Sequence, residues 1–167
     1  MDTLTILLRL CHIIFGTLWA GTVFFTTLFL LPRLRRLGPS IQNSVLNSLM
    51  PIITPVMMLS CLLVIGTGIA LTLLVWGSLG MLFTTASGWV LFVGFIATLA
   101  AAVVGFGVLA PAGMQLSKLN KALEGREPHP DEASDLMRLN ARIEVFDRLN
   151  FIFMLIAVGT MGFLRYV

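Results

Sequence analysis

Apolar residues dominate the chain in four long blocks, separated by short polar or glycine-rich segments. The blocks cover residues 4–31, 48–76, 86–112 and 145–166, each about 20 residues or longer. Apolar runs of about 18 or more residues are typical of transmembrane helices, because a helix of that length crosses the hydrocarbon core. The pattern predicts an all-α fold, an integral membrane four-helix bundle that forms a single transmembrane domain over residues 1–167.

Prolines and glycines predict where these helices begin, bend and end. Pro32 is expected to end the first helix, because proline cannot continue the hydrogen-bond ladder and restricts the residue before it. Pro51 is expected in the first turn of the second helix, and Pro55 is expected to bend it. Glycines between residues 77 and 88 predict a short turn, so the second and third helices should form an antiparallel hairpin.

The polar segment between the third and fourth blocks has a helical pattern of its own. A helix end is expected near Gly125, and a new helix start near Asp131, where acidic residues favour the positive end of the helix dipole. Apolar residues then recur every three or four positions. They are Leu136, Leu139, Ile143, Phe146 and Leu149. The sequence therefore predicts a short cytoplasmic helical extension between helices 3 and 4.

Composition supports a membrane location and limits the chemistry. The chain is 57% hydrophobic and 11% charged, whereas soluble domains carry roughly 25% charged residues. Residues 37–117 contain no Asp, Glu, Lys, Arg or His. An ionisable residue at membrane depth is typical of proton-coupled carriers, so this stretch argues against that class. Cys11 and Cys61 both lie in apolar blocks and are expected to be unpaired, buried thiols.

Basic residues predict the orientation. Nine of the eleven lysines and arginines lie in two polar segments, residues 32–47 and residues 113–148. The positive-inside rule makes these segments cytoplasmic and places both termini outside. The net charge of +3 lies in these connecting segments, so it indicates orientation and predicts no binding of nucleic acid.

The most unusual residue of the first block is His12, an imidazole inside an otherwise apolar segment. At helical spacing it shares a face with Arg9, Gly16 and Trp19. Gly16 leaves space beside the imidazole, Trp19 supplies a flat aromatic wall, and Arg9 lies one turn outward. An axial nitrogen, room for a ring and a cation for a propionate are the requirements of a haem site, with His12 as the metal ligand.

The same four residues also have a purely structural interpretation. His12 can hydrogen-bond a neighbouring hydroxyl or carbonyl group, and Gly16 can serve close helix packing. Arg9 can extend to the membrane interface, and Trp19 can belong to the core. The spacing alone leaves both interpretations open.

A second polar cluster lies where the fourth block begins, in the stretch NARIEVFDRLN. Asp147 and Arg148 lie close to membrane depth there, and Arg33 follows Pro32 on the same side. An unpaired charge is costly at that depth, so Arg148 is expected to pair with Asp147, Glu144 or an anion. The cluster predicts either interfacial ion pairs or a polar inner site for a headgroup or an anionic ligand.

The stretch LRLCHIIFGTLWAGTVFFTTLFLLPRL, residues 8–34, resembles the first helix of bacterial four-helix membrane proteins of the HemJ type. These are protoporphyrinogen oxidases that carry haem, and copper-resistance-D-like bundles are related to them. The matching positions are His12, Trp19, Gly21, Pro32 and Arg33. That family carries a lysine at the start of its third span, where this chain reads TTASGWVLFVG. The resemblance implies a location in the bacterial inner membrane.

Together these features predict a membrane protein that binds haem b through His12. The resemblance implies electron transfer or porphyrin oxidation, with a quinone or porphyrin as partner molecule. The alternative is a non-catalytic accessory subunit that packs against a membrane-protein partner or a second copy of itself. A small-solute carrier is a third, weaker interpretation, because such carriers show internal symmetry that is not apparent here.

Overall fold

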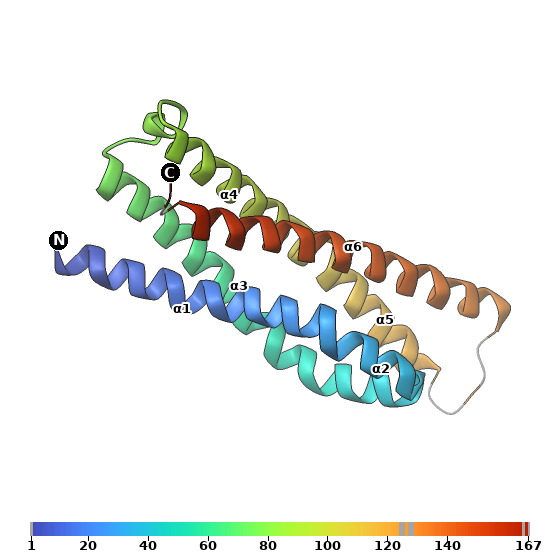
Figure 1. The fold of residues 1–167 in the computed structure, drawn as a ribbon. Helices are drawn as coiled ribbons and strands as arrows, with labels where there is room; N and C mark the ends of the chain where they lie inside the picture. Colours follow the sequence, from blue (N-terminus) through green and yellow to red (C-terminus); the bar gives the residue numbers. More distant parts are fainter. Residues whose placement is uncertain (1, 124–125, 127–128, 165, 167) are drawn as a thin grey trace.

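The computed structural model describes residues 2–123, 126, 129–164 and 166. The elements in chain order are α1 Thr3–Phe25, η1 Thr26–Leu30, α2 Leu31–Leu37, α3 Pro39–Trp76, η2 Leu79–Phe83, α4 Ala86–Ala102, η3 Val103–Leu109, α5 Ala110–Ala122 and α6 Pro130–Phe163. Consecutive elements join into four long helices, each long and apolar enough to cross a membrane. The fold is the expected all-α four-helix bundle (Figure 1).

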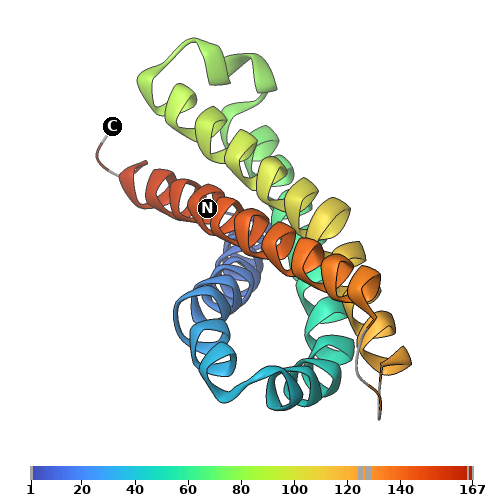
Figure 2. The same cartoon turned by 90° about the vertical axis from the view of Figure 1, so that its right-hand side faces the viewer.

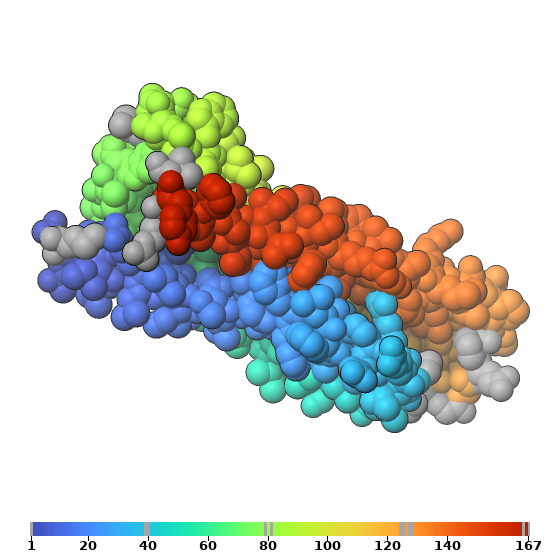
Figure 3. Space-filling model, viewed as in Figure 1, coloured from blue at the N-terminus to red at the C-terminus, as the bar shows by residue number. Residues whose placement is uncertain are grey.

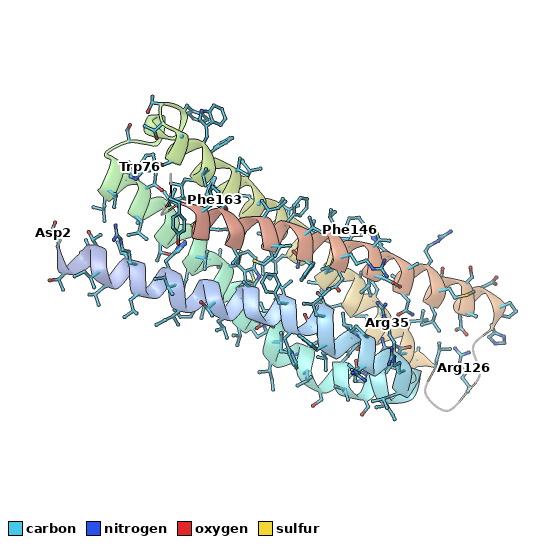
Figure 4. The ribbon with its side chains drawn as sticks, viewed as in Figure 1. Asp2, Arg35, Trp76, Arg126, Phe146 and Phe163 are labelled. Atoms are coloured by element: carbon cyan, nitrogen blue, oxygen red, sulfur yellow. The ribbon has the colours of Figure 1, made fainter. Side chains whose placement is uncertain are left out.

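The bundle has two distinct ends (Figure 4). Asp2, Trp76 and Phe163 lie at one end, together with both termini and the η2 turn, and we call this the termini end. Arg35 and Arg126 lie toward the other end, which is formed by α2, α5 and the first half of α6, and we call this the basic end.

The first long helix does not end at Pro32, so that prediction is wrong. The chain passes through the π-helical segment η1 and continues as α2 to Leu37. In η1 the Leu31 N–H reaches back five residues to the Thr26 carbonyl. Proline has no N–H, and its ring clashes with the carbonyl four residues earlier, and a widened turn relieves both problems. Gly38, with φ 91°, ends the helix instead.

A proline preceded by a π-helical segment also occurs in the third long helix. Segment η3 is also π-helical, and the Ala110 N–H reaches back five residues to the Gly105 carbonyl. Pro111 follows directly, in the same place relative to η3 that Pro32 has relative to η1. Each proline is therefore accommodated by a wide turn just before it, and each helix stays continuous.

Helix α3 begins earlier than the apolar pattern predicts. It starts at Pro39, directly after Gly38, so Pro51 lies in its interior and the prediction of a first-turn position is wrong. Pro55 also lies inside α3, which continues through both prolines to Trp76. Both proline residues are exposed.

Helix packing differs from chain order. Helix α1 packs along α3, and α4 packs along α6, whereas α3 and α4 touch over a shorter stretch. The views agree that the bundle consists of these two helix pairs (Figures 1 and 2). A short turn joins the second and third spans, as expected, but these two helices pack mainly against other helices and less against each other.

The core is small and lies where the two pairs meet. Its buried members are Trp19, Ala20, Val23, Cys61, Val64, Ala101 and Met154. Large apolar side chains cover much of the exterior, including Leu7, Ile14 and Phe25 on α1. The space-filling view shows an elongated body (Figure 3). An apolar exterior over four spanning helices is compatible with a lipid bilayer as surroundings.

The polar extension is present as predicted. Helix α5 packs against α6 and carries the bundle past the apolar segments. Helix α6 begins at Pro130, where the backbone N–H of His129 donates to Glu132 Oε2 at 3.0 Å. Arg126 also donates to Glu132, which ties the connecting segment to the start of α6. The helix end expected near Gly125 lies outside the described residues.

Candidate functional site

His12 lies at the contact between α1 and α3. Its Nδ1 is 2.9 Å from Oγ1 of Thr67, and its Cε1 lies 3.2 Å from the position that a Cβ on Gly68 would take. The Thr67 hydroxyl donates its only hydrogen to the carbonyl of Leu63, so its oxygen accepts from the imidazole. This hydrogen-bond pattern assigns the hydrogen to Nδ1 and the lone pair to Nε2.

The other residues of the predicted haem face do not enclose a space beside His12. A Cβ on Gly16 would lie 3.8 Å from Val64 Cγ2, so α3 covers this glycine and uses it for close packing. Trp19 is 3% exposed and belongs to the core. Arg9 is exposed near the start of α1. A porphyrin on His12 would have to lie on a side of the imidazole other than the one facing Gly16.

A large cavity lies in the other half of the bundle, toward the basic end. Its volume is about 580 Å³, and all four long helices line it. We call it the central cavity. Trp19 and Val23 form its wall on α1, and Met57 and Phe106 face it from α3 and η3. Figure 2 views the bundle from the basic end, where α2, α3 and α6 lie toward the viewer.

The walls of the central cavity combine apolar and polar side chains. Apolar residues form most of the lining, and polar groups cluster near the basic end, among them Gln42, Asn47 and Lys118. On α6, Asp147 and Asn150 follow each other by one turn along the wall. Asn150 is 5% exposed, and its Oδ1 has no hydrogen-bond partner among the described residues. Buried polar atoms usually have a partner, so this acceptor is available to a donor group in the cavity.

Both π-helical segments lie in the cavity wall. Thr26 and Leu30 of η1 face it from one side, and Gly105, Phe106 and Leu109 of η3 face it from the other. Wide turns of this kind occur frequently at functional sites, because they displace the backbone from the regular ladder. A Cβ on Gly105 would meet nothing within 4 Å, so the wall is open there.

The predicted polar inner site is partly assembled. Asp147 lines the central cavity, and Arg148 forms an ion pair with Glu144 one turn away. Glu144 also pairs with Arg35 of α2, at 3.3 Å between Arg35 Nη1 and Glu144 Oε1. Arg33 is exposed. The arginine of α2 that reaches α6 is Arg35, because the helix continues past Pro32 and turns this position toward α6.

Sequence reasoning missed the central cavity. Its residues come from all four long helices, and none of these stretches has a motif. The local signals in this region are the two prolines that follow wide turns and the polar residue Asp147 of the predicted inner site. Among the described residues, no group of three or more His, Cys, Asp or Glu side chains could hold a metal ion.

Comparison with protein-family models, curated proteins and solved structures gives no match to this chain. The HemJ-type resemblance of the first helix therefore stays a prediction, based on the residues quoted for it.

Proposed function

We propose that this chain is a membrane-embedded binding protein that holds a small amphipathic molecule in the central cavity. The observation that carries the proposal is the cavity itself, about 580 Å³ within the bundle. Ligand pockets in proteins typically range from about 300 to 1,000 Å³ and combine apolar walls with a few polar groups. The central cavity has both properties.

The lining defines the chemistry of the ligand. An apolar body would lie against Met57, Phe106 and Leu109, which line the cavity in the apolar half of the bundle. A polar group that donates a hydrogen bond would satisfy the buried Oδ1 of Asn150 and contact Asp147. Leaving such an acceptor unmet costs about 1–3 kcal/mol, so a ligand that supplies the donor gains affinity.

The proposal includes an orientation in the membrane. The basic end faces the cytoplasm, because nine of eleven lysines and arginines lie there. Both termini then lie outside, and the cavity faces the cytoplasmic leaflet. A ligand that partitions into this leaflet reaches the cavity at a high local concentration.

Trp19 offers a direct test, because it lines the cavity and is buried. In a Trp76→Phe and Trp89→Phe background, Trp19 is the only tryptophan, and bromine quenches tryptophan fluorescence on contact. Titration of the protein in phosphatidylcholine nanodiscs with 11-bromoundecanol should give saturable quenching. Quenching that rises only linearly with probe concentration would show partitioning into lipid alone and contradict the proposal.

Two glycines on η3 provide a matched pair of variants. Gly105 lines the cavity and has space for a side chain, so Gly105→Leu should fill the cavity and abolish the saturable quenching. Gly107 is exposed and is not part of the lining, so Gly107→Leu should leave the titration unchanged. Equal behaviour of the two variants would place the probe elsewhere.

A second candidate function rests on His12. We propose that its Nε2 can ligate the iron of a haem b, which would give the protein a redox role toward a quinone or a porphyrin. What supports this is the contact with Thr67, which holds the hydrogen on Nδ1 and leaves Nε2 as a donor atom. Ligating histidines are commonly fixed in this way through their other nitrogen. Bound haem would supply the electron-accepting iron.

An absorption spectrum tests this candidate. Protein purified from haem-replete cells should show a Soret band that His12→Ala abolishes or shifts. His12→Gln, which keeps polar groups able to bond Thr67, should also lose the band if the histidine is a ligand. A colourless wild-type protein would contradict haem binding. Copurification of a colourless protein with a larger membrane complex would favour an accessory subunit instead.

A further inference from the structure

A second, smaller pocket opens between α2 and α6. Its volume is about 100 Å³, and four charged side chains line it together with Thr27. These are Arg35, Glu144, Asp147 and Arg148. We call it the lateral pocket. Arg35 and Asp147 line both the lateral pocket and the central cavity, so the two adjoin at these residues.

The charges of the lateral pocket balance. Glu144 Oε1 forms ion pairs with both arginines: it lies 3.3 Å from Arg35 Nη1, and it accepts a hydrogen bond from Arg148 Nη2. Asp147 lies within electrostatic reach of Arg35. The Arg148 side chain is 72% exposed, so most of its guanidinium donors face outward from the pocket. The lateral pocket therefore presents the Asp147 carboxylate on its inner side and the Arg148 guanidinium on its outer side.

The lateral pocket lies where both helices change from apolar to charged sequence. Between Leu10 and Leu31 the first helix has no charged residue, and Arg33 is the first to follow. On α6, Arg148 is the last charged residue before the apolar segment, which starts at Leu149. This boundary is the depth at which lipid headgroups meet a spanning helix.

We propose that the lateral pocket binds the headgroup of a zwitterionic phospholipid with a primary ammonium, as in phosphatidylethanolamine. The ammonium donates to the Asp147 carboxylate and the Thr27 hydroxyl, and the phosphate accepts from the outer guanidinium of Arg148. The proposal goes beyond ligand binding in the central cavity and does not depend on it.

The charge balance selects this headgroup over its two common alternatives. Phosphatidylglycerol has a phosphate and neutral hydroxyl donors but no cation, so it brings no positive charge to the Asp147 carboxylate. Phosphatidylcholine has a quaternary ammonium, which has no N–H to donate to the carboxylate. Charge-assisted hydrogen bonds are about twice as strong as neutral ones, so the loss of the N–H donors weakens binding clearly.

Lipid retention measures this selectivity. The protein is exchanged into nanodiscs of phosphatidylcholine that contain equal small fractions of phosphatidylethanolamine and phosphatidylglycerol. It is then extracted with mild detergent, and native mass spectrometry counts the lipids that stay bound. Phosphatidylethanolamine should be enriched over both other lipids. Enrichment of phosphatidylglycerol would indicate an anion site, and equal retention would indicate an unspecific lipid shell; either result overturns the proposal.

Variants locate the retained lipid. Asp147→Asn should reduce the enrichment about tenfold, as expected for the loss of one charge-assisted hydrogen bond. Arg148→Gln should also reduce the enrichment. Because Arg148 is exposed, this variant should fold even if Asp147→Asn does not. Arg142→Gln is the matched control, because Arg142 lies on the same helix, outside the pocket, over the Phe146 ring. Unchanged enrichment in Arg148→Gln contradicts the proposal.

The fluorescence titration with 11-bromoundecanol separates this proposal from the first. If Arg148→Gln loses lipid enrichment but keeps saturable quenching of Trp19, the lateral pocket and the central cavity are independent sites. If wild-type protein shows enrichment without saturable quenching, the lipid site stands and the cavity proposal fails.

Discussion

At the scale of single residues, small side chains decide how closely the helices approach. Gly16 and Gly68 bring α1 and α3 together around His12, and Gly94 does the same for α4 against α6. With no strong hydrophobic force between helices in lipid, such close packing and interhelical hydrogen bonds are the main sources of association. Each of these contacts can be tested by a substitution that adds or removes one or two side-chain atoms.

The first residue-scale prediction concerns the bond between His12 and Thr67. Thr67→Val keeps the shape of the side chain but removes the hydroxyl, so the imidazole loses its partner on α3. The free energy of unfolding should fall by about 0.6 kcal/mol, and by no more than about 1.7, the range found for hydrogen bonds between membrane helices. Thermal unfolding in detergent measures this. Thr67→Ser should behave as wild type, and equal loss in both variants would assign the effect to packing.

The second residue-scale prediction concerns Gly94. A methyl group there would meet the Thr160 hydroxyl on α6 and lie 3.3 Å from Thr160 Cβ. Gly94→Ala should therefore destabilise the protein by about 1–3 kcal/mol. Thr160→Ala in the same chain should recover part of the loss. Gly66→Ala is the control, because its Cβ would have no atom within 4 Å, and it should not destabilise.

At the scale of elements, proline within a spanning helix widens a turn without ending the helix. Segments η1 and η3 each lie directly before a proline, and both line the central cavity. Threonine hydroxyls support the first of them, because Thr26 Oγ1 donates to the carbonyls of Thr22 and Val23. The local sequence thus shapes the cavity wall, because it changes the backbone hydrogen bonding of the helix.

Removal of either proline should restore a regular helix. Pro32→Ala and Pro111→Ala should each raise the free energy of unfolding, by up to about 3 kcal/mol, the helix-interior difference between proline and alanine. Amide exchange in η1 or η3 should slow correspondingly. Pro130→Ala is the control, because a proline in the first turn of α6 costs little. Unchanged exchange in both segments would contradict a role of the prolines in widening these turns.

At the scale of the whole molecule, two helix pairs meet at a small core near Trp19, and the central cavity lies beside it, toward the basic end. Polar and charged residues concentrate at that end, and the termini lie at the opposite one (Figure 4). The asymmetry of charge between the two ends is the feature that sets orientation in a membrane.

The orientation yields a prediction that thiol labelling checks. With Cys11 and Cys61 replaced by alanine, a cysteine placed at Glu127 should react with a membrane-impermeant reagent only after cell lysis. A cysteine placed at Asp2 should react in intact cells, because the termini lie on the other side. The opposite pattern would reverse the proposed orientation and the leaflet that the cavity faces. Glu127 lies outside the described residues, and its place on the polar connection follows from the sequence.

The sequence by itself determined the number of spanning helices and the polar extension between the last two. Both follow from the length and period of apolar runs, which are local properties. It also identified His12, Asp147 and Arg148 as unusual, because polar groups in apolar runs are costly and stand out without any knowledge of the fold.

Tertiary structure decided which of these residues come together. Gly16 was expected to leave a space beside His12, but Val64 of α3 covers it. Arg35 reaches Glu144 only because α2 continues past a proline. The central cavity depends on the paired packing of α1 with α3 and α4 with α6. Contacts between helices depend on the relative rotation and tilt of whole elements, and no period along a single helix contains that information.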